Sequence, residues 1–323
     1  MLYNENGDDM KRRRLKKWAI ALLVGVIVFV IAISLIIAHF IKINSVSYKL
    51  GKIGYHTEEI TKITKILTKD EINNDVLKMG YDENLDDIVS EKYFIYSNLK
   101  RYLDYRKLNN VSATAVVTMV NANRDKDYYS NMQATDTTKD ILMLVNKYYY
   151  LDEKYVPSDL VDIATKYAYA GNQIRSIAYD DLKSMFNDAK TAGYTLIVNS
   201  GYRSYDWQKT VYNSRKVAYG LSYADKYVAR PGNSEHQSGL AIDLAQYGSK
   251  DDFKTSDAYK WLTDNSYKYG FIQRYNDSQE EVTGFSAEEW HFRYVGKDAA
   301  KVIHEAGLSF DEYYAYYVLN KGN

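Results

Sequence analysis

The apolar residues of this chain form one uninterrupted run near the N-terminus and short amphipathic segments after it. The run extends from Trp18 to Ile41, and Ala19–Ile37 contains no charged side chain. At about 1.5 Å per residue, a helix of this length crosses a ~30 Å hydrocarbon core. A cleaved signal peptide is the alternative, but its apolar region usually has roughly 7–15 residues and precedes a small-residue cleavage motif. The pattern therefore predicts an uncleaved transmembrane anchor at residues 18–41.

Basic residues precede this run directly. Six lysines and arginines lie within residues 11–17, and cytoplasmic flanks of membrane helices carry such an excess of positive charge. We expect residues 1–17 to form a cytoplasmic basic tail and the chain after Lys42 to lie outside the membrane. The predicted location is the cell membrane, single-pass, with the chemistry on the cell surface or in the wall.

Residues 42–137 are charged and biased towards helix. Apolar residues recur every three or four positions in 58–79 and in 87–108, which is typical of amphipathic helices. The segment 111–122, rich in valine, favours a strand instead. We interpret the region as a helix-rich stalk, in preference to a wall-binding accessory domain.

The pattern changes near Asp140, and residues 138–309 mix short apolar strands with helices. No clean βαβ repeat is present, so the pattern favours an α+β domain with a small sheet and flanking helices. Residues 310–323 are expected to form a helical tail. The main expected elements are a strand at 195–198, a helix at 206–219, a strand at 239–245, a helix at 258–271 ending at Gly270, and a strand at 290–295.

Alternation along two of these strands separates polar from apolar side chains. In the first strand, Leu240, Ile242 and Leu244 face one side and Asp243 faces the other. In the second, alternation groups Trp290 with Phe292 and Tyr294, and places His291 with Arg293 on the opposite face.

Composition limits the chemistry. The absence of cysteine excludes disulfides, thiolate metal sites and cysteine nucleophiles, and leaves His, Asp and Glu as metal ligands. Lys and Arg balance Asp and Glu at 42 each, so net charge gives no argument for nucleic acid as a partner.

A metal site is the first chemical hypothesis. His236 and Asp243 are separated by six residues, with Gly239 between them where the backbone can turn, and His291 offers a third ligand. Three protein ligands leave one position for water, as in catalytic zinc sites. Both Glu288 and Glu289 precede His291 as possible bases, and strand alternation by itself favours Glu289.

Three further residues suit substrate binding. Arg203 follows a strand end, where its guanidinium would stabilise an oxyanion or bind a terminal carboxylate. Ser234 and Gln208 are weaker choices as hydrogen-bond partners of the substrate. These side chains, together with a metal, suit a hydrolase acting on an amide bond.

The segments SGYRSYDWQ, SEHQSGLAIDL and EEWHFRYVG occur in an order and spacing that resemble the VanY-type D-alanyl-D-alanine carboxypeptidases, within the LAS group of zinc peptidases. Their S-x-H-x-x-G-x-A-x-D motif matches residues 234–243 without a departure, and the resemblance covers about 140–309. It implies a small antiparallel LAS/Hedgehog-like sheet, one zinc ion held by His236, Asp243 and His291, Glu288 as general base, and Arg203 assisting the transition state. Where many members have proline, this chain has Glu289.

The resemblance implies that the chain removes the terminal D-alanine from peptidoglycan stem peptides. Within the same scaffold, an L,D-carboxypeptidase or an endopeptidase is the alternative. From a different class, the alternative is a non-catalytic protein that binds the cell wall.

Overall fold

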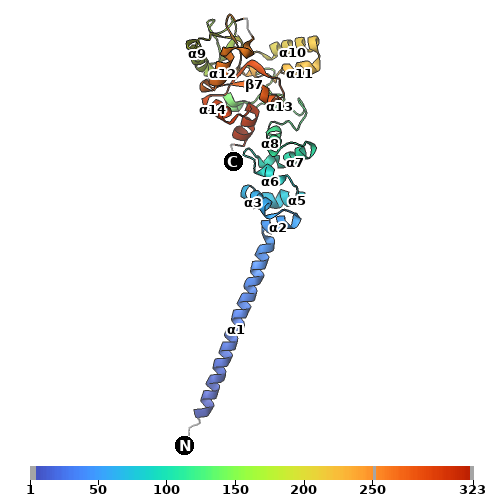
Figure 1. Cartoon of the computed structure of the whole chain (residues 1–323), viewed down its shortest axis with the longest axis vertical. Coiled ribbons are helices and arrows are strands. Elements are labelled where there is room, and N and C mark those ends of the chain that lie inside the picture. Colours follow the sequence, from blue (N-terminus) through green and yellow to red (C-terminus); the bar gives the residue numbers. More distant parts are fainter. Residues whose placement is uncertain (1–4, 250–251, 321–323) are drawn as a thin grey trace. The chain divides into compact units, whose positions relative to one another are not determined.

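The computed structural model describes residues 5–249 and 252–320, which fall into two compact units, Met1–Ser90 and Glu91–Asn323 (Figure 1). The predicted domain boundaries after residues 17, 41, 137 and 309 stay predictions.

The first unit is helical throughout its described part. Its longest helix, α1 (Glu5–Asn44), contains the 35-residue stretch Met10–Asn44, within which an 18-residue window has a mean hydropathy of 3.4 and no buried residues. That length and composition fit a single membrane span. The helices predicted after it are also present, and they bury Leu50, Ile63 and Leu85. They are α2 (Val46–Ile53), α3 (Thr57–Ile66), α4 (Lys69–Glu71), a π-helical turn (Ile72–Val76), α5 (Leu77–Met79) and α6 (Leu85–Val89).

The second unit begins with α7 (Leu99–Leu108) and α8 (Ala113–Asn121). The strand predicted at 111–122 is wrong, because this segment forms α8. The Ser112 side chain caps the helix by accepting a hydrogen bond from the backbone N–H of Ala115. Val116, Val117 and Val120 lie on its buried face. Burial of these valines outweighs their modestly low helix propensity.

Four antiparallel strands form the main sheet, in the order β5-β6-β8-β7. This agrees with the predicted small antiparallel sheet. The strands are β5 (Leu196–Ser200), β6 (Ala241–Gln246), β7 (Phe271–Tyr275) and β8 (Glu288–Tyr294), and two smaller sheets pair β1 (Gln133–Ala134) with β2 (Tyr149–Tyr150), and β3 (Leu160–Asp162) with β4 (Gln173–Arg175).

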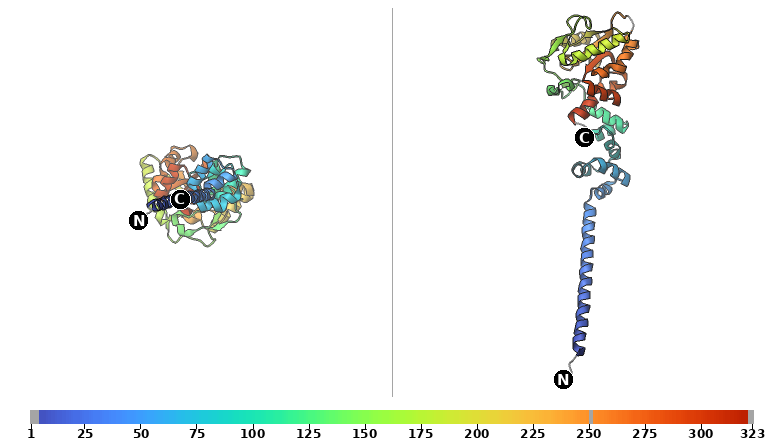
Figure 2. Two further views of the ribbon diagram at one scale, coloured as in Figure 1. Left: turned by 90° about the horizontal axis from the view of Figure 1, so that it is seen from below. Right: turned by 90° about the vertical axis from the view of Figure 1, so that its left-hand side faces the viewer.

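One face of the main sheet packs on the core. Ile242, Leu244 and Phe292 meet α9 (Ser176–Thr191) and α12 (Asp257–Asn265) in one apolar cluster; α9 is the long yellow-green helix in Figure 2. The predicted alternation of β6 is thus confirmed. Asp243 pairs in register with His291, and both side chains lie on the face turned away from this cluster.

Helices and turns surround the second face and the sheet edges. A buried apolar cluster that includes Ile303 and Phe310 packs behind β7. Further helices of this unit are α10 (Tyr205–Tyr219), α11 (Leu221–Tyr227), α13 (Glu280–Thr283), α14 (Lys297–Ala306), α15 (Phe310–Tyr313) and a π-helical turn (Tyr314–Leu319).

Candidate metal centre and active site

The turn after β5 positions Arg203. A Cβ atom at Gly201 would overlap the backbone carbonyl of Gln173, so the close approach of the two segments requires glycine there. Ser204 then caps the start of α10 by accepting a hydrogen bond from the backbone N–H of Trp207. Arg203 is directed into the site by donating to Ser200 Oγ at 2.9 Å and to Gln208 Oε1 at 2.8 Å.

A short 3-10 turn (Glu235–Ser238) carries His236, and Gly239 ends it with a left-handed backbone (φ 68°). His236 Nδ1 lies 2.8 Å from the carbonyl oxygen of Gly201. Because a carbonyl oxygen only accepts hydrogen bonds, Nδ1 carries the proton. The lone pair of the imidazole is therefore on Nε2, which faces Asp243.

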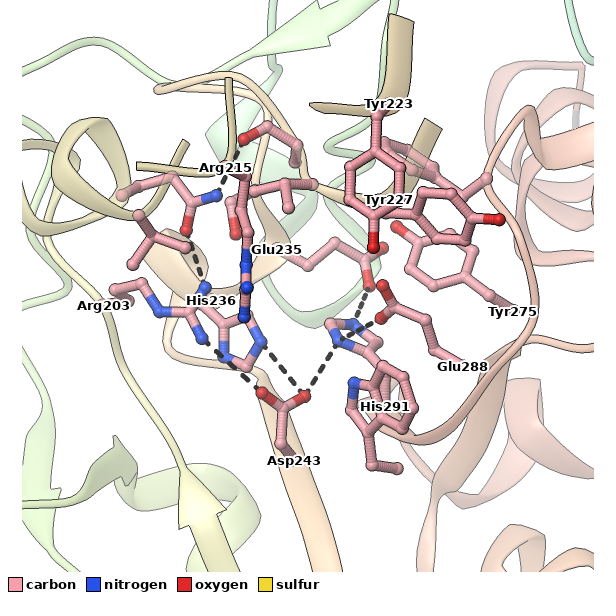
Figure 3. A pocket seen from close by; sticks show the side chains of 17 residues that line it. Arg203, Arg215, Tyr223, Tyr227, Glu235, His236, Asp243, Tyr275, Glu288 and His291 are labelled. Atoms are coloured by element: carbon pink, nitrogen blue, oxygen red, sulfur yellow. Dashed lines mark hydrogen bonds and ion pairs between the residues drawn. The ribbon is translucent and has the colours of Figure 1, made fainter. Parts of the chain in front are cut away.

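The structure brings the three predicted metal ligands together. One ligand atom from each of His236, Asp243 and His291 lies within 4.8 Å of the other two. Asp243 Oδ1 is 3.3 Å from His236 Nε2 and 3.3 Å from His291 Nδ1, as the dashed lines in Figure 3 indicate. This oxygen is buried without a hydrogen-bond partner. Two imidazoles and an orphaned carboxylate oxygen are a donor set that fits zinc.

Glu288 lies beside this cluster. Its Oε2 is 3.6 Å from His291 Nδ1, although strict alternation predicts Glu289 on that side. The pairing of β7 with β8 is irregular here, because a step of two positions from Gln273 to Tyr275 is matched by a step of four from Phe292 to Glu288. Such an irregularity redirects side chains. Glu289 instead points to Lys254 Nζ, 3.0 Å away.

The same irregularity corrects the placement of Trp290. Alternation groups its side chain with that of Phe292, which is buried in the core, but Trp290 is 42% exposed and lines the cleft. The cleft has a volume of about 300 Å³ and also contains the side chains of Arg203, His236, Asp243, Glu288 and His291.

Burial changes the acidity of these groups. Burial raises the pKa of Glu288 to about 7, close to the value at which a carboxylate serves as a base near neutral pH. Burial lowers the pKa of His236, which favours the neutral imidazole that binds metals. Arg203 has a lowered pKa for the same reason, partly offset by Asp243, whose Oδ2 is 3.5 Å from Arg203 Nη2.

Sequence reasoning missed Glu235, which supports His291 from behind. Glu235 Oε2 lies 3.3 Å from His291 Nε2, so the carboxylate can accept a hydrogen bond from Nε2–H, which leaves the lone pair of Nδ1 for the metal. Burial opposes ionisation of Glu235, but Arg274 and Arg293 outweigh it and hold its pKa well below the usual range. Glu235 lies inside the recognised motif, but its arginine partners lie 39 and 58 residues away.

A buried ion cluster continues from Glu235. Glu235 Oε1 accepts from Arg274 Nε at 2.8 Å and from Arg293 Nη1 at 3.1 Å. Arg274 Nη1 is in turn 2.8 Å from Asp311 Oδ2. All four side chains are at most 4% exposed. The predicted tail 310–323 therefore supplies one member of this cluster.

Ser234 and Gln208 are both buried at the cleft wall. Gln208 accepts from Arg203 through its oxygen and donates to the carbonyl of Ala229 at 2.7 Å. These contacts suit a residue that orients Arg203, and the predicted substrate contacts of Gln208 and Ser234 stay predictions.

Comparison with known proteins gives several consistent matches. A family model described as VanY, D-alanyl-D-alanine carboxypeptidase, matches residues 171–297, a range that contains every predicted site residue. YodJ of Bacillus subtilis (strain 168), named as a carboxypeptidase, is similar to this chain with 41% identity over 206 residues, which cover 59% of this chain and 75% of YodJ. A D-alanyl-D-alanine carboxypeptidase of Enterococcus faecalis (strain ATCC 700802 / V583) is 35% identical over 181 residues, 53% of this chain and 65% of that protein.

A solved structure is also similar. The LdcB LD-carboxypeptidase, whose structure is described as revealing the molecular basis of peptidoglycan recognition, shares 42% identity with a TM-score of 0.54. The match covers 57% of this chain and 90% of LdcB. The identity to YodJ over three quarters of that relative, together with the family match across the metal ligands, shows that the chain belongs to the VanY family of D-alanyl-D-alanine carboxypeptidases.

Proposed function

We propose that the chain is a zinc-dependent D-alanyl-D-alanine carboxypeptidase that removes the terminal D-alanine from peptidoglycan stem peptides. The observation that carries this proposal is the convergence of His236, Asp243 and His291 around an unpartnered carboxylate oxygen, with Glu288 at 3.6 Å from His291. A zinc ion held there supplies Lewis-acid activation of water and of the substrate carbonyl.

Side chains of the chain carry out proton transfer and stabilise the charge that develops during the reaction. Glu288 takes a proton from the attacking water and gives it to the leaving amine. Water adds its oxygen to the carbonyl carbon, the C–N bond breaks, and the products are a shortened peptide and free D-alanine. Arg203, fixed by Ser200 and Gln208, offers its guanidinium to the developing oxyanion or to the terminal carboxylate.

A second candidate activity has specific support. LdcB, the structure with 42% identity, is an LD-carboxypeptidase. An L,D-carboxypeptidase on the same scaffold would release the D-alanine of a tetrapeptide in place of the last residue of a pentapeptide. Both activities use the same ligands and base.

The experiment is mass spectrometry of defined muropeptides after incubation with purified, zinc-loaded protein. Release of D-alanine from the pentapeptide supports the proposal, and release from the tetrapeptide alone supports the L,D alternative. Cleavage inside a peptide would indicate an endopeptidase. If protein with stoichiometric zinc releases D-alanine from neither peptide, the carboxypeptidase proposal is wrong and a non-catalytic wall-binding role remains.

The proposed location follows from α1. The six basic residues in 11–17 support a cytoplasmic N-terminus, which places the catalytic unit outside the membrane, where peptidoglycan lies. Residues 42–137 would then serve as a membrane-proximal stalk, 138–309 as the LAS/Hedgehog-like catalytic domain and 310–323 as its C-terminal extension.

A further inference from the structure

The outer wall of the cleft is built by the α10–α11 helical hairpin. Arg215 from α10 and Tyr223 and Tyr227 from α11 line the same cavity as the metal ligands. Figure 3 shows these three side chains around the cavity together with His236 and Glu288. The inner end therefore carries the reactive groups, and the rim carries an arginine and two aromatic rings.

Arg215 is exposed and lacks an acidic partner among the described residues. Its guanidinium lies 6.0 Å from the ring centroid of Tyr219. The other arginines around the site each contact a carboxylate: Arg203 contacts Asp243, Arg230 contacts Asp225, and Arg274 and Arg293 contact Glu235. Arg215 is thus a second cation of this cleft, and its fork of donors, unlike that of Arg203, faces no carboxylate of the described chain.

The tyrosines form a wall of defined shape beside this cation. The rings of Tyr219, Tyr223 and Tyr227 contact one another in sequence at a tilt, with centroids 4.6 Å and 4.5 Å apart. Gly220, with φ 88°, makes the break between α10 and α11, and the row of rings continues across this break. Tyr223 and Tyr227 remain 40% and 41% exposed, so their apolar surface is open to a bound chain.

The cleft is too small to enclose a peptide of several residues, so the outer part of such a substrate would lie at this rim. A volume of about 300 Å³ lies at the lower end of ligand pockets, which usually measure about 300–1,000 Å³. An extended peptide advances about 3.3–3.6 Å per residue. With the cleaved bond beside the metal ligands, the residues on its N-terminal side that do not fit the inner end would extend past the rim formed by α10 and α11.

We propose that Arg215, with Tyr223 and Tyr227, forms an outer subsite for a free carboxylate on the N-terminal side of the cleaved bond. The inference rests on the proposed peptidase function and adds a substrate preference to it. The enzyme would favour a stem peptide whose acidic residue carries a carboxylate over the same peptide with a carboxamide there. The tyrosine rings would pack against the aliphatic part of that residue.

The test uses two zinc-bound variants of the full chain and two stem peptides that differ only in this carboxylate or carboxamide. Exposed ion pairs contribute little, so the wild type should show about a 5-fold higher kcat/KM for the carboxylate peptide, through KM. Arg215→Gln should reduce this ratio to about 1 and leave the carboxamide peptide within about 2-fold. The preference of the wild type should also weaken in concentrated salt.

Lys216→Gln is the matched control, because it removes one positive charge from the next position of α10 and does not line the cleft. It should preserve the preference. The subsite is overturned if Arg215→Gln slows both peptides equally, if Lys216→Gln abolishes the preference as well, or if the active wild type treats both peptides alike. A wild type that hydrolyses neither peptide refutes the proposed function itself, and the subsite with it.

Discussion

Glu288 and Glu289 are neighbours in sequence but occupy different environments. Glu288 faces His291 inside the cleft, where burial raises its pKa to about 7, whereas Glu289 pairs with Lys254 at 3.0 Å. The proposed roles of these two carboxylates can therefore be separated by conservative substitutions.

We expect Glu288→Gln to retain stoichiometric zinc and to lose roughly 10²–10⁴-fold in kcat, because an amide cannot carry the proton. Metal content by mass spectrometry and D-alanine release give the two measurements. Glu289→Gln is the control and should keep activity near that of the wild type. His236→Ala should instead lose the metal. If Glu289→Gln were the inactive variant, the base would be misassigned.

Glu235 allows a second test, directed at metal affinity. Its carboxylate orients His291 through Nε2, so Glu235→Gln should weaken zinc binding by about 10–100-fold, measured by competition with a chelator. Asp311→Asn changes the same buried cluster through Arg274 without contacting His291. It should lower the melting temperature and preserve zinc affinity. If Glu235→Gln and Asp311→Asn lost zinc affinity to the same extent, Glu235 would contribute to the stability of the cluster and not to the orientation of His291.

At the scale of elements, the turn after β5 and the irregular start of β8 bring the site together. The turn contributes Arg203 and the carbonyl that fixes His236, and it depends on the contact of Gly201 with the backbone of Gln173. Displacement of this turn would therefore move two parts of the site at once.

Gly201→Ala should lower the free energy of unfolding by about 1–3 kcal/mol, because its methyl group meets a backbone atom that cannot rotate away. It should also lower kcat/KM. Gly51→Ala, inside α2 with only Ile60 at 3.8 Å, is the control and should be neutral or stabilising. Thermal unfolding and D-alanine release check both variants, and unchanged activity in Gly201→Ala would argue against this role of the turn.

Lys147 connects α11 to the segment before Phe285. Its ammonium donates to the carbonyls of Asp225 at 2.7 Å and Gly284 at 2.5 Å, and lies 4.2 Å from the ring centroid of Phe285, a residue of the cleft wall. Burial lowers the pKa of Lys147 from 10.5 to about 8.

Lys147 therefore predicts a pH dependence of stability. Between pH 8 and 10.5 the unfolded chain holds this proton more tightly than the folded chain, so the contribution of Lys147 to the free energy of unfolding rises with pH. Denaturant unfolding at several pH values should show that the free energy of unfolding rises less steeply with pH in Lys147→Met than in the wild type. Lys226→Met, at an exposed position of α11, is the control, and its free energy of unfolding should depend on pH as that of the wild type does. If the pH dependence of the free energy of unfolding were the same in Lys147→Met and in the wild type, Lys147 would not contribute to it.

The sequence predicted the elements whose pattern is local. Gly270 as a helix end and the alternation of β6 each depend on neighbours in the chain, and the structure has both. The helix α8 depends on tertiary packing of its valines, and the position of Trp290 depends on the register of β7 and β8. The local pattern of residues therefore predicted both incorrectly. Glu235 was missed because its role depends on arginines on two other strands.

At the scale of the whole molecule, α1 carries the only apolar stretch in the described residues that is long enough to span a membrane. Side chains such as Leu22, Phe29 and Leu35 are more than 60% exposed. A chain lacking residues 1–44 should move from the membrane fraction to the soluble fraction and keep zinc-dependent activity, as fractionation and peptide assays would measure. An N-terminus located after Ile41 in protein isolated from cells would instead indicate a cleaved signal peptide.

The buried cluster behind His291 also links the ligand-bearing strands to a helix that comes later in the chain. Asp311 neutralises Arg274 inside this cluster, and the ribosome adds Asp311 after it has added His236, Asp243 and His291. A nascent chain that has emerged only as far as β8 contains every ligand but leaves Arg274 one carboxylate short of its native partners. The core behind the ligands is therefore complete only when α15 has packed, so the stability of the folded unit depends on Asp311 even though Asp311 contacts none of the ligands.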